Sequence, residues 1–154
     1  MHAQHGLFSF EIDEPLCRFA RQWIDRAGLS TVVQVELRSS LDPVSPQLAW
    51  DYLGGAPGLV FLDSSHEYQQ TLDELGAWYP VLAPGGLLVL HDTSAFAASF
   101  DVTQKGGVHR ALREWRDAHP GVEVISLNRN VPAMETPAIV YQDFCGAGLI
   151  QKPV

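Results

Sequence analysis

Hydrophobic and polar residues change their spacing along the chain, and these changes predict short strands separated by helices. Runs that alternate with polar residues, or stay apolar for four or more positions, predict the strands. These runs are "GLFSFE", "TVVQVEL", "LVFLD", "LLVLHD", "VEVISL" and "PAIVYQ", the last covering 137–142. The final two are expected to form a closing pair of strands, with Pro137 favouring an edge position.

Apolar residues at helical spacing follow the first strand and predict an amphipathic helix there. Asp13 is the expected N-cap, Pro15 fits the first turn, and Gly28 ends the helix. The apolar face of this helix consists of Leu16, Phe19, Ala20, Trp23, Ile24 and Ala27. We expect this face to pack into the protein core.

Three more helices are predicted along the chain. One begins with Ser45 as its N-cap and breaks at Gly54. The next spans 66–82 and places Asp73 and Glu74 outward. The last carries on its apolar face Val108, Ala111, Leu112 and Trp115. The tryptophans expected in the core, because they lie on apolar helical faces, are Trp23, Trp78 and Trp115.

Strands that alternate with helices predict an α/β fold built on a mainly parallel sheet. In such a sheet the carboxyl ends of the parallel strands meet along one edge, where ligands bind. Several predicted strands end in polar or charged residues. These residues are Glu11, Ser39, Ser40, Asp63, His91 and Asp92. We expect them to converge at that edge, with 94–107 as a mobile loop over the site.

The composition favours one folded domain over residues 1–154, since 46% of the residues are hydrophobic and 18% are charged. The formal net charge of −8 argues against binding to nucleic acid or to an anionic membrane surface. Cys17 and Cys145 lie far apart and indicate neither a disulfide framework nor a zinc site. No run of about 18 apolar residues predicts a membrane span. We therefore expect a cytoplasmic protein with small-molecule or protein partners.

Several segments, in chain order, resemble the class I S-adenosylmethionine-dependent O-methyltransferases, in particular the group with sugar, macrolide and cephalosporin-pathway enzymes. "FEIDEPLCRFARQWIDRAGL" resembles the family's second strand and the following helix, and "VQVELRSSLD" its third strand and adenine-side loop. The most specific segment, "LVFLDSSHEYQQTLDELGAWYPVLAPGGLLVLHDT", is similar to the fourth strand, a helix and the fifth strand. "GVHRALREW" and "CGAGLI" continue the order. The resemblance implies a Rossmann-like, three-layer α/β/α fold with a mainly parallel sheet and a C-terminal antiparallel strand.

The resemblance also implies S-adenosylmethionine as the cofactor. It places Glu11 on the two ribose hydroxyls, a role that suits an ionised carboxylate because its oxygens only accept hydrogen bonds. Ser39 and Ser40 lie on the adenine side, and we expect Asp63 among the cofactor-binding residues as well. From the residues alone, Glu11 is equally a solvated loop acid, and Ser39 and Ser40 are equally turn caps.

Asp63 and Asp92 end strands that we expect to be neighbours, which would bring the two carboxylates within about 5 to 8 Å of each other. Two such charges repel unless a cation lies between them or one is protonated. Metal-dependent relatives hold Mg²⁺ with acids at these positions, so the resemblance implies a magnesium site and a catalytic role for Asp63. No third acidic ligand is evident, because His91 and Thr93 flank Asp92. In the alternative interpretation, Asp63 caps the helix that begins at His66.

His66 lies where certain sugar methyltransferases of the family have a general base. An imidazole that titrates near neutral pH suits the removal of a hydroxyl proton. His66 is therefore a candidate catalytic residue, and a structural histidine at a helix start is the alternative. His91 follows an apolar strand and is a candidate core histidine.

The resemblance implies methyl transfer to a hydroxyl group of a small molecule, by in-line attack. The family's first strand and glycine-rich loop should precede "GLFSFEID", where the sequence has only "MHAQH", so we expect a domain truncated at its N-terminus. The alternative function is therefore a catalytically inactive methyltransferase-like domain that acts in dimerisation or partner binding. A homodimer would cover sheet edges that the truncation exposes. A dinucleotide-dependent dehydrogenase is less favoured, because no G-x-G-x-x-G follows a strand.

Overall fold

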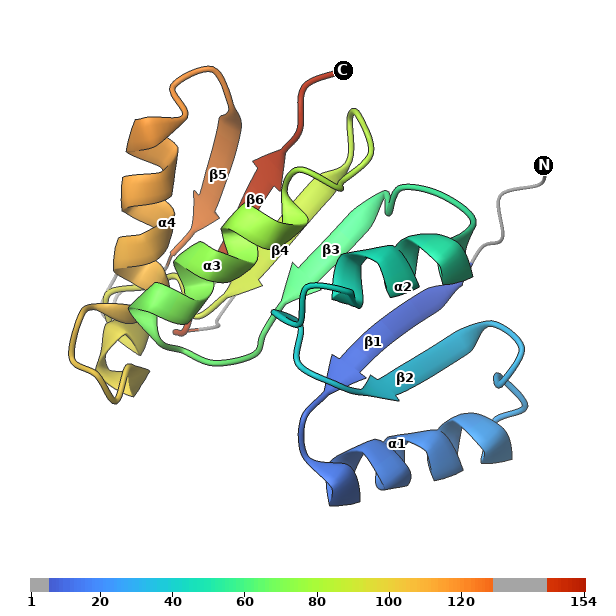
Figure 1. Ribbon diagram of the computed structural model, residues 1–154. Helices are drawn as coiled ribbons and strands as arrows, with labels where there is room; N and C mark the ends of the chain where they lie inside the picture. The colour runs from blue at the N-terminus through green and yellow to red at the C-terminus, as the bar shows by residue number, and fades with distance from the viewer. Residues whose placement is uncertain (1–5, 129–143) are drawn as a thin grey trace, which may run out of the picture. The chain divides into compact units, whose positions relative to one another are not determined.

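The computed structural model describes residues 6–128 and 144–154, which form two compact units. The first unit ends at Pro57 and the second begins at Gly58. Figure 1 shows strands and helices in both units. The elements are β1 (Leu7–Glu11), α1 (Glu14–Arg26), β2 (Val33–Leu37), α2 (Ser45–Leu53), β3 (Leu59–Leu62), α3 (Tyr68–Trp78), β4 (Leu87–His91), the 3₁₀ helix η1 (Ala97–Phe100), α4 (Gly107–Ala118), β5 (Glu123–Leu127) and β6 (Ala147–Gln151).

In the first unit, β1 and β2 form a two-stranded parallel sheet, in which Glu11 pairs with Leu37 at the carboxyl end. The helix between these strands, α1, begins as predicted, because the Asp13 side chain accepts a hydrogen bond from the Leu16 amide at 2.8 Å. Gly28 follows the helix with a φ of 70°, a left-handed conformation that glycine adopts without strain. The predicted start and end of this helix are therefore confirmed.

Two predictions for the first unit are wrong. Val44, not Ser45, is the N-cap of α2, and the buried Ser45 hydroxyl instead donates to the Ser39 carbonyl oxygen at 2.7 Å. Trp23 lies outside the core, with 53% of its surface exposed. The reason is geometric: α1 buries Cys17 against a sheet of two five-residue strands, which covers only part of the helix's apolar face.

In the second unit, four strands form one sheet in the order β3-β4-β6-β5, with β3 and β4 parallel and the remaining pairs antiparallel. The helices α3 and α4 pack against each other. α4 also packs on β6, where a Cβ atom on Gly148 would lie only 2.5 Å from the Leu112 side chain. The core consists of Leu62, Leu75, Trp78, Leu82, Leu88, Leu90, Ala97, Val108, Ala111, Leu112, Trp115 and Ile150. The predicted α/β fold with a C-terminal antiparallel strand is confirmed.

The helix α3 differs from its predicted form in length and in the face that it buries. It begins at Tyr68, two residues later than predicted, and ends before Pro80, whose ring cannot continue the helical hydrogen bonding. Its buried side chains are Thr71, Glu74, Leu75 and Trp78. The prediction that Glu74 faces outward is therefore wrong.

The strand β3 lies at the edge of its sheet, because β4 is its only partner among the described residues. Leu59 and Phe61 are 61% and 58% exposed, so the strand is less buried than its sequence suggests. At the other end of the sheet, β5 pairs antiparallel with β6. The strand predicted at 137–142 lies outside the described residues.

The carboxylate of Asp101 organises 94–107, the segment predicted as a mobile loop. Asp101 is buried and accepts hydrogen bonds from the amides of Thr103, Lys105 and Gly107 at 2.8 to 3.0 Å. Burial alone would raise the pKa of this carboxyl, but hydrogen bonds from Thr103, Gly107 and the Tyr68 amide outweigh it and lower the pKa from 3.8 to about 2. The segment therefore has a defined structure, and its mobility stays a prediction.

No helix in the described ranges is long and apolar enough to cross a membrane. The longest, α1, has 13 residues, whereas a span needs about 20.

Candidate active site

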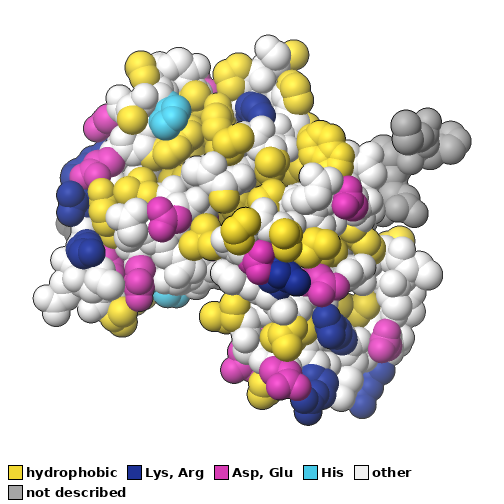
Figure 2. All heavy atoms as spheres, viewed as in Figure 1, with side chains coloured by type: hydrophobic (Ala, Val, Ile, Leu, Met, Phe, Trp, Pro, Cys, Tyr) yellow, Lys and Arg dark blue, Asp and Glu magenta, His cyan; other side chains and the backbone are white. Residues whose placement is uncertain are grey.

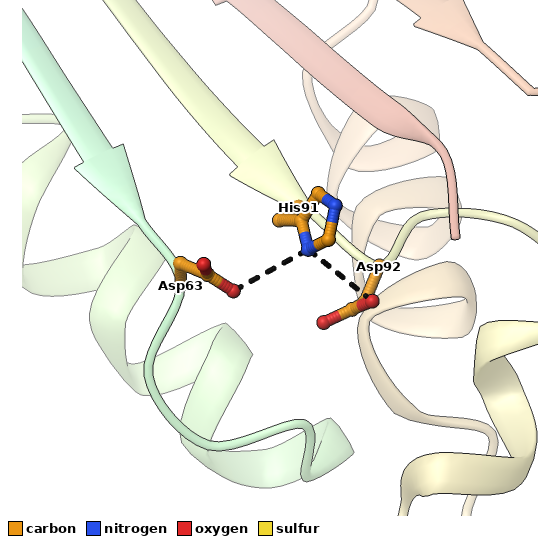
Figure 3. A group of neighbouring side chains, drawn as sticks. All are labelled: Asp63, His91 and Asp92. Carbon is orange, nitrogen blue, oxygen red and sulfur yellow. Dashed lines mark ion pairs between the residues drawn. The ribbon is translucent and has the colours of Figure 1, made fainter. Parts of the chain in front are cut away.

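The ends of β3 and β4 bring together the acidic residues that the sequence predicts as neighbours. Asp63 follows β3 directly and Asp92 follows β4, and the two strands pair in parallel with Leu62 opposite Leu90. Ligand atoms of Asp63, His91 and Asp92 all lie within 4.8 Å of one another. Figure 3 shows the His91 ring between the two carboxylates. The carboxylates of Asp63 and Asp92 therefore lie closer together than the 5 to 8 Å expected from strand spacing.

Asp92 is buried, and each of its carboxylate oxygens lies beside an imidazole. Its Oδ2 atom lies 2.6 Å from Nδ1 of His66, and its Oδ1 atom lies 3.3 Å from Nδ1 of His91. Only 4% of the Asp92 side chain is exposed, against 41% for His66. Burial of a carboxylate is costly unless it is paired, and the two imidazoles supply that pairing.

His91 is a site residue rather than a core histidine. A third of its side chain is exposed, and Nδ1 also lies 3.5 Å from Oδ1 of Asp63. The helix-cap interpretation of Asp63 is wrong, because the N-cap of α3 is Glu67. His66 precedes that helix, and the Phe100 ring of η1 contacts its imidazole edge-on at 5.7 Å between centroids.

A small hollow of about 10 Å³ lies among these side chains, close to the space that a single water molecule or ion requires. The lining includes Asp63, His66, His91 and Asp92 together with Glu74 of α3. Three carboxylates and two imidazoles thus surround one small space. A cation would offset the mutual repulsion of the carboxylates.

Glu74 is the site residue that the sequence analysis missed. Its side chain is buried, and both carboxylate oxygens lie 2.7 Å from the Ser64 hydroxyl, which donates to them. Ser64 follows Asp63 in the chain, so Glu74 fixes the segment that carries a candidate ligand. Thr71 and Trp78, at spacings of three and four residues from Glu74, are the signal that could have placed it on the buried face.

Three of the four residues predicted to bind the cofactor lie at the carboxyl end of the sheet in the first unit, whereas the fourth, Asp63, belongs to the second unit. Glu11 ends β1, and its Oε1 atom accepts a hydrogen bond from the Asp13 amide at 2.8 Å. Ser39 and Ser40 follow the adjacent strand β2, where the Ser39 hydroxyl accepts a hydrogen bond from the Leu41 amide at 3.2 Å. The Ser39 hydroxyl therefore supports a turn, which is the structural alternative for this residue. The cofactor roles of all three residues stay predictions.

A family model described as a methyltransferase domain matches residues 2–93, more than half of the chain. The chain belongs to this family of methyltransferase domains. The match includes the carboxyl ends of β1, β2, β3 and β4, and therefore every candidate site residue named above. A search of curated proteins found no match.

Solved structures support the fold. The O-methyltransferase from Bacillus cereus, in complex with SAH, matches with a TM-score of 0.70 and 18% identity, over 96% of this chain and 62% of its own. TomG from Streptomyces achromogenes, an O-methyltransferase involved in tomaymycin synthesis and in complex with SAM, matches with a TM-score of 0.68 and 18% identity, over 97% and 62%. An rRNA methylase from Streptococcus thermophilus matches with a TM-score of 0.63 and 12% identity, over 97% and 74%.

These likenesses establish a Rossmann-like methyltransferase fold. The chain spans 62% of the length of the first two relatives. An rRNA methylase and an enzyme of tomaymycin synthesis share the fold, so the fold alone does not identify the acceptor.

Proposed function

We propose that this methyltransferase domain transfers a methyl group from S-adenosylmethionine to a hydroxyl group of a small molecule. The observation that carries the proposal is the 2.6 Å pairing of His66 with the buried Asp92 at the carboxyl ends of two parallel strands. Ligands of parallel α/β sheets bind at that edge. The complexes of two fold relatives with SAH and SAM support the same cofactor for this chain.

Asp92 prepares His66 to accept a proton. In a neutral imidazole one ring nitrogen donates and the other accepts, and the Asp92 carboxylate can only accept. Nδ1 of His66 therefore carries the hydrogen, and Nε2 is the nitrogen that takes the hydroxyl proton. The carboxylate then stabilises the imidazolium that forms, and the hydroxyl oxygen becomes a better nucleophile.

The first unit offers groups that fit the cofactor. One oxygen of Glu11 is engaged by the Asp13 amide, and a carboxylate has about four lone-pair sites, which leaves capacity for a ribose diol. Ser39 and Ser40 would lie beside the adenine. We also propose Asp63, a residue of the second unit, as a cofactor-binding residue. When bound, S-adenosylmethionine supplies an electrophilic methyl group.

The second unit offers groups that fit a divalent cation. Asp63 and Asp92 would hold it, and the small hollow with several carboxylates around it supports this role. A cation there, Mg²⁺ by the family resemblance, would orient substrate oxygens.

The proposal also covers the class of acceptor, the location and the oligomeric state of the protein. The net charge of −8 supports a small-molecule acceptor over nucleic acid or a membrane surface. We also propose a cytoplasmic homodimer. A second candidate function, an inactive domain for dimerisation or partner binding, is favoured by the exposed Leu59 and Phe61 on the edge strand β3.

The test measures S-adenosylhomocysteine release with a panel of hydroxylated small molecules. We expect the His66→Ala variant to lower kcat by about 10²- to 10⁴-fold while it binds S-adenosylmethionine as tightly as the wild type. His119→Ala is the matched control, because His119 stacks on Trp115 after the end of α4. An unchanged rate for His66→Ala would refute the role of the base.

A further inference from the structure

We propose that the metal at this site is a first-row transition dication, such as Mn²⁺ or Co²⁺, rather than Mg²⁺. The imidazole nitrogen of His91 is its third ligand, beside one oxygen each from Asp63 and Asp92. This inference rests on the divalent cation of the proposed function and specifies its chemistry. The sequence alone predicts only the two carboxylates as ligands.

Two of the three distances between the ligand atoms match a shared metal, and all three atoms lie within 4.8 Å of one another. Ligand atoms that bind one dication at about 2.1 Å lie about 3.0 Å apart at right angles and about 3.4 Å apart in a tetrahedron. Nδ1 of His91 lies 3.5 Å from Oδ1 of Asp63 and 3.3 Å from Oδ1 of Asp92. Figure 3 shows one oxygen of each carboxylate joined to this nitrogen by a dashed line. The Asp63 side chain is 43% exposed and can rotate to adjust the distance between its ligand oxygen and that of Asp92.

The nitrogen donor decides which metal the set prefers. Mg²⁺ demands oxygen ligands in near-ideal octahedral geometry and loses its water reluctantly. Imidazole suits Zn²⁺, Fe²⁺ and Ni²⁺, carboxylate also suits Mn²⁺, and affinity rises from Mn²⁺ through Co²⁺ along the first row. A ligand set with one imidazole and two carboxylates therefore favours transition dications over Mg²⁺.

Neighbouring hydrogen bonds hold the ligands in place. The second oxygen of Asp92 pairs with His66 at 2.6 Å, which leaves Oδ1 directed toward His91. Glu74 accepts a hydrogen bond from Ser64, the residue that follows the ligand Asp63. Such outer partners orient metal ligands and strengthen binding.

The test titrates the metal-free full chain with Co²⁺, Mn²⁺ and Mg²⁺ in the absence of cofactor and acceptor. Visible absorption reports Co²⁺, electron paramagnetic resonance reports Mn²⁺, and calorimetry reports Mg²⁺. We expect Co²⁺ to bind at least about 100-fold more tightly than Mg²⁺, with Mn²⁺ between them. Circular dichroism of each variant confirms that it folds.

Two variants at His91 separate the ligand from its surroundings. His91→Ala should weaken Co²⁺ binding by at least about 10-fold and change Mg²⁺ binding little. His91→Glu replaces the nitrogen ligand with a carboxylate and so creates an all-oxygen set. This variant should reduce the preference for Co²⁺ over Mg²⁺ to less than about 10-fold. His119→Ala should bind all three metals as the wild type does.

Two outcomes would overturn the inference: no binding of Co²⁺ or Mn²⁺, or a metal preference that both His91 variants leave unchanged. Absence of binding would mean that the three residues form only an ion-pair network, and an unchanged preference would mean that His91 is not a ligand. Binding of S-adenosylmethionine to the same sample distinguishes this failure from failure of the proposed function. Normal cofactor binding with an unchanged metal preference refutes the metal inference alone, and the reverse result refutes the methyltransferase activity alone.

Discussion

The two units differ in how much of their apolar surface they bury. In the first unit, the buried apolar side chains among the described residues are Cys17, Val35 and Ala49, while Phe19 and Trp23 are more than half exposed. In the second unit, the buried set is four times as large and includes Leu75, Leu88, Leu90 and Ile150 at 1% exposure or less. Figure 2 shows hydrophobic side chains at the surface of the viewed face.

This difference coincides with a difference in chemistry. The second unit carries the carboxylates and imidazoles of the candidate active site, and its core fixes the strand ends that bear them. The first unit carries Glu11, Ser39 and Ser40, three of the residues predicted to bind the cofactor, on a sheet of two strands. Reacting groups need positions held to within fractions of an ångström, so the better-packed unit is the one suited to hold them.

The largest expected effect comes from the core of the second unit. Leu75→Ala removes a fully buried side chain and should lower the free energy of unfolding by about 2 to 5 kcal/mol. Phe19→Ala is the matched change on the exposed face of α1, and it should alter the free energy of unfolding by less than about 0.5 kcal/mol. Urea unfolding followed by tryptophan fluorescence measures both. An equal loss in the two variants would show that the face of α1 is covered in solution.

A smaller effect is expected from the buried carboxylate of Asp101. Its pKa of about 2 lies below the ordinary value of 3.8, so its contribution to stability is present above pH 4 and is lost as the pH falls from 4 to 2. Asp101→Asn should therefore cost about 2 kcal/mol at pH 7 and progressively less below pH 4. Urea unfolding at a series of pH values measures the difference. A constant difference from pH 7 to pH 2 would contradict the hydrogen-bonding role of the carboxylate.

The smallest expected effect on stability comes from substitutions at the starts of two helices. Asp13 accepts the Leu16 amide at the start of α1, so Asp13→Ala should cost about 1 kcal/mol. Glu67, the N-cap of α3, makes no side-chain cap hydrogen bond, so Glu67→Ala should cost less than about 0.3 kcal/mol. The same unfolding assay compares the two. A larger loss for Glu67→Ala would mean that α3 depends on its local cap rather than on core packing.

The sequence predicts most of the secondary structure, because the spacing of apolar residues and the caps of helices are local properties. Asp13 and Gly28 delimit α1 as expected. The approach of Asp63 to Asp92 also follows from sequence, since residues that end adjacent parallel strands must meet. The residue Ser45 shows the limit of local rules, because its hydroxyl is engaged by Ser39, six positions earlier.

Long-range packing decides what the sequence does not reveal. The inward position of Glu74 depends on Ser64 and on which face of α3 meets the core. The position of His91 beside two carboxylates depends on the pairing of two strands, whereas the pattern alone assigns this residue to the core. Exposure of Trp23 depends on how much sheet lies opposite its helix.

The most direct test of the central claim is isothermal titration of S-adenosylmethionine into the full chain. A methyltransferase domain should bind it saturably with a Kd below about 1 mM, a free energy near −4 kcal/mol or stronger. Glu11→Ala should weaken this binding by at least about 10-fold, since a charged acceptor is lost, while Glu14→Ala, an exposed acid of α1, should leave it unchanged. Absence of binding at millimolar cofactor would contradict the claim that this chain is an active methyltransferase.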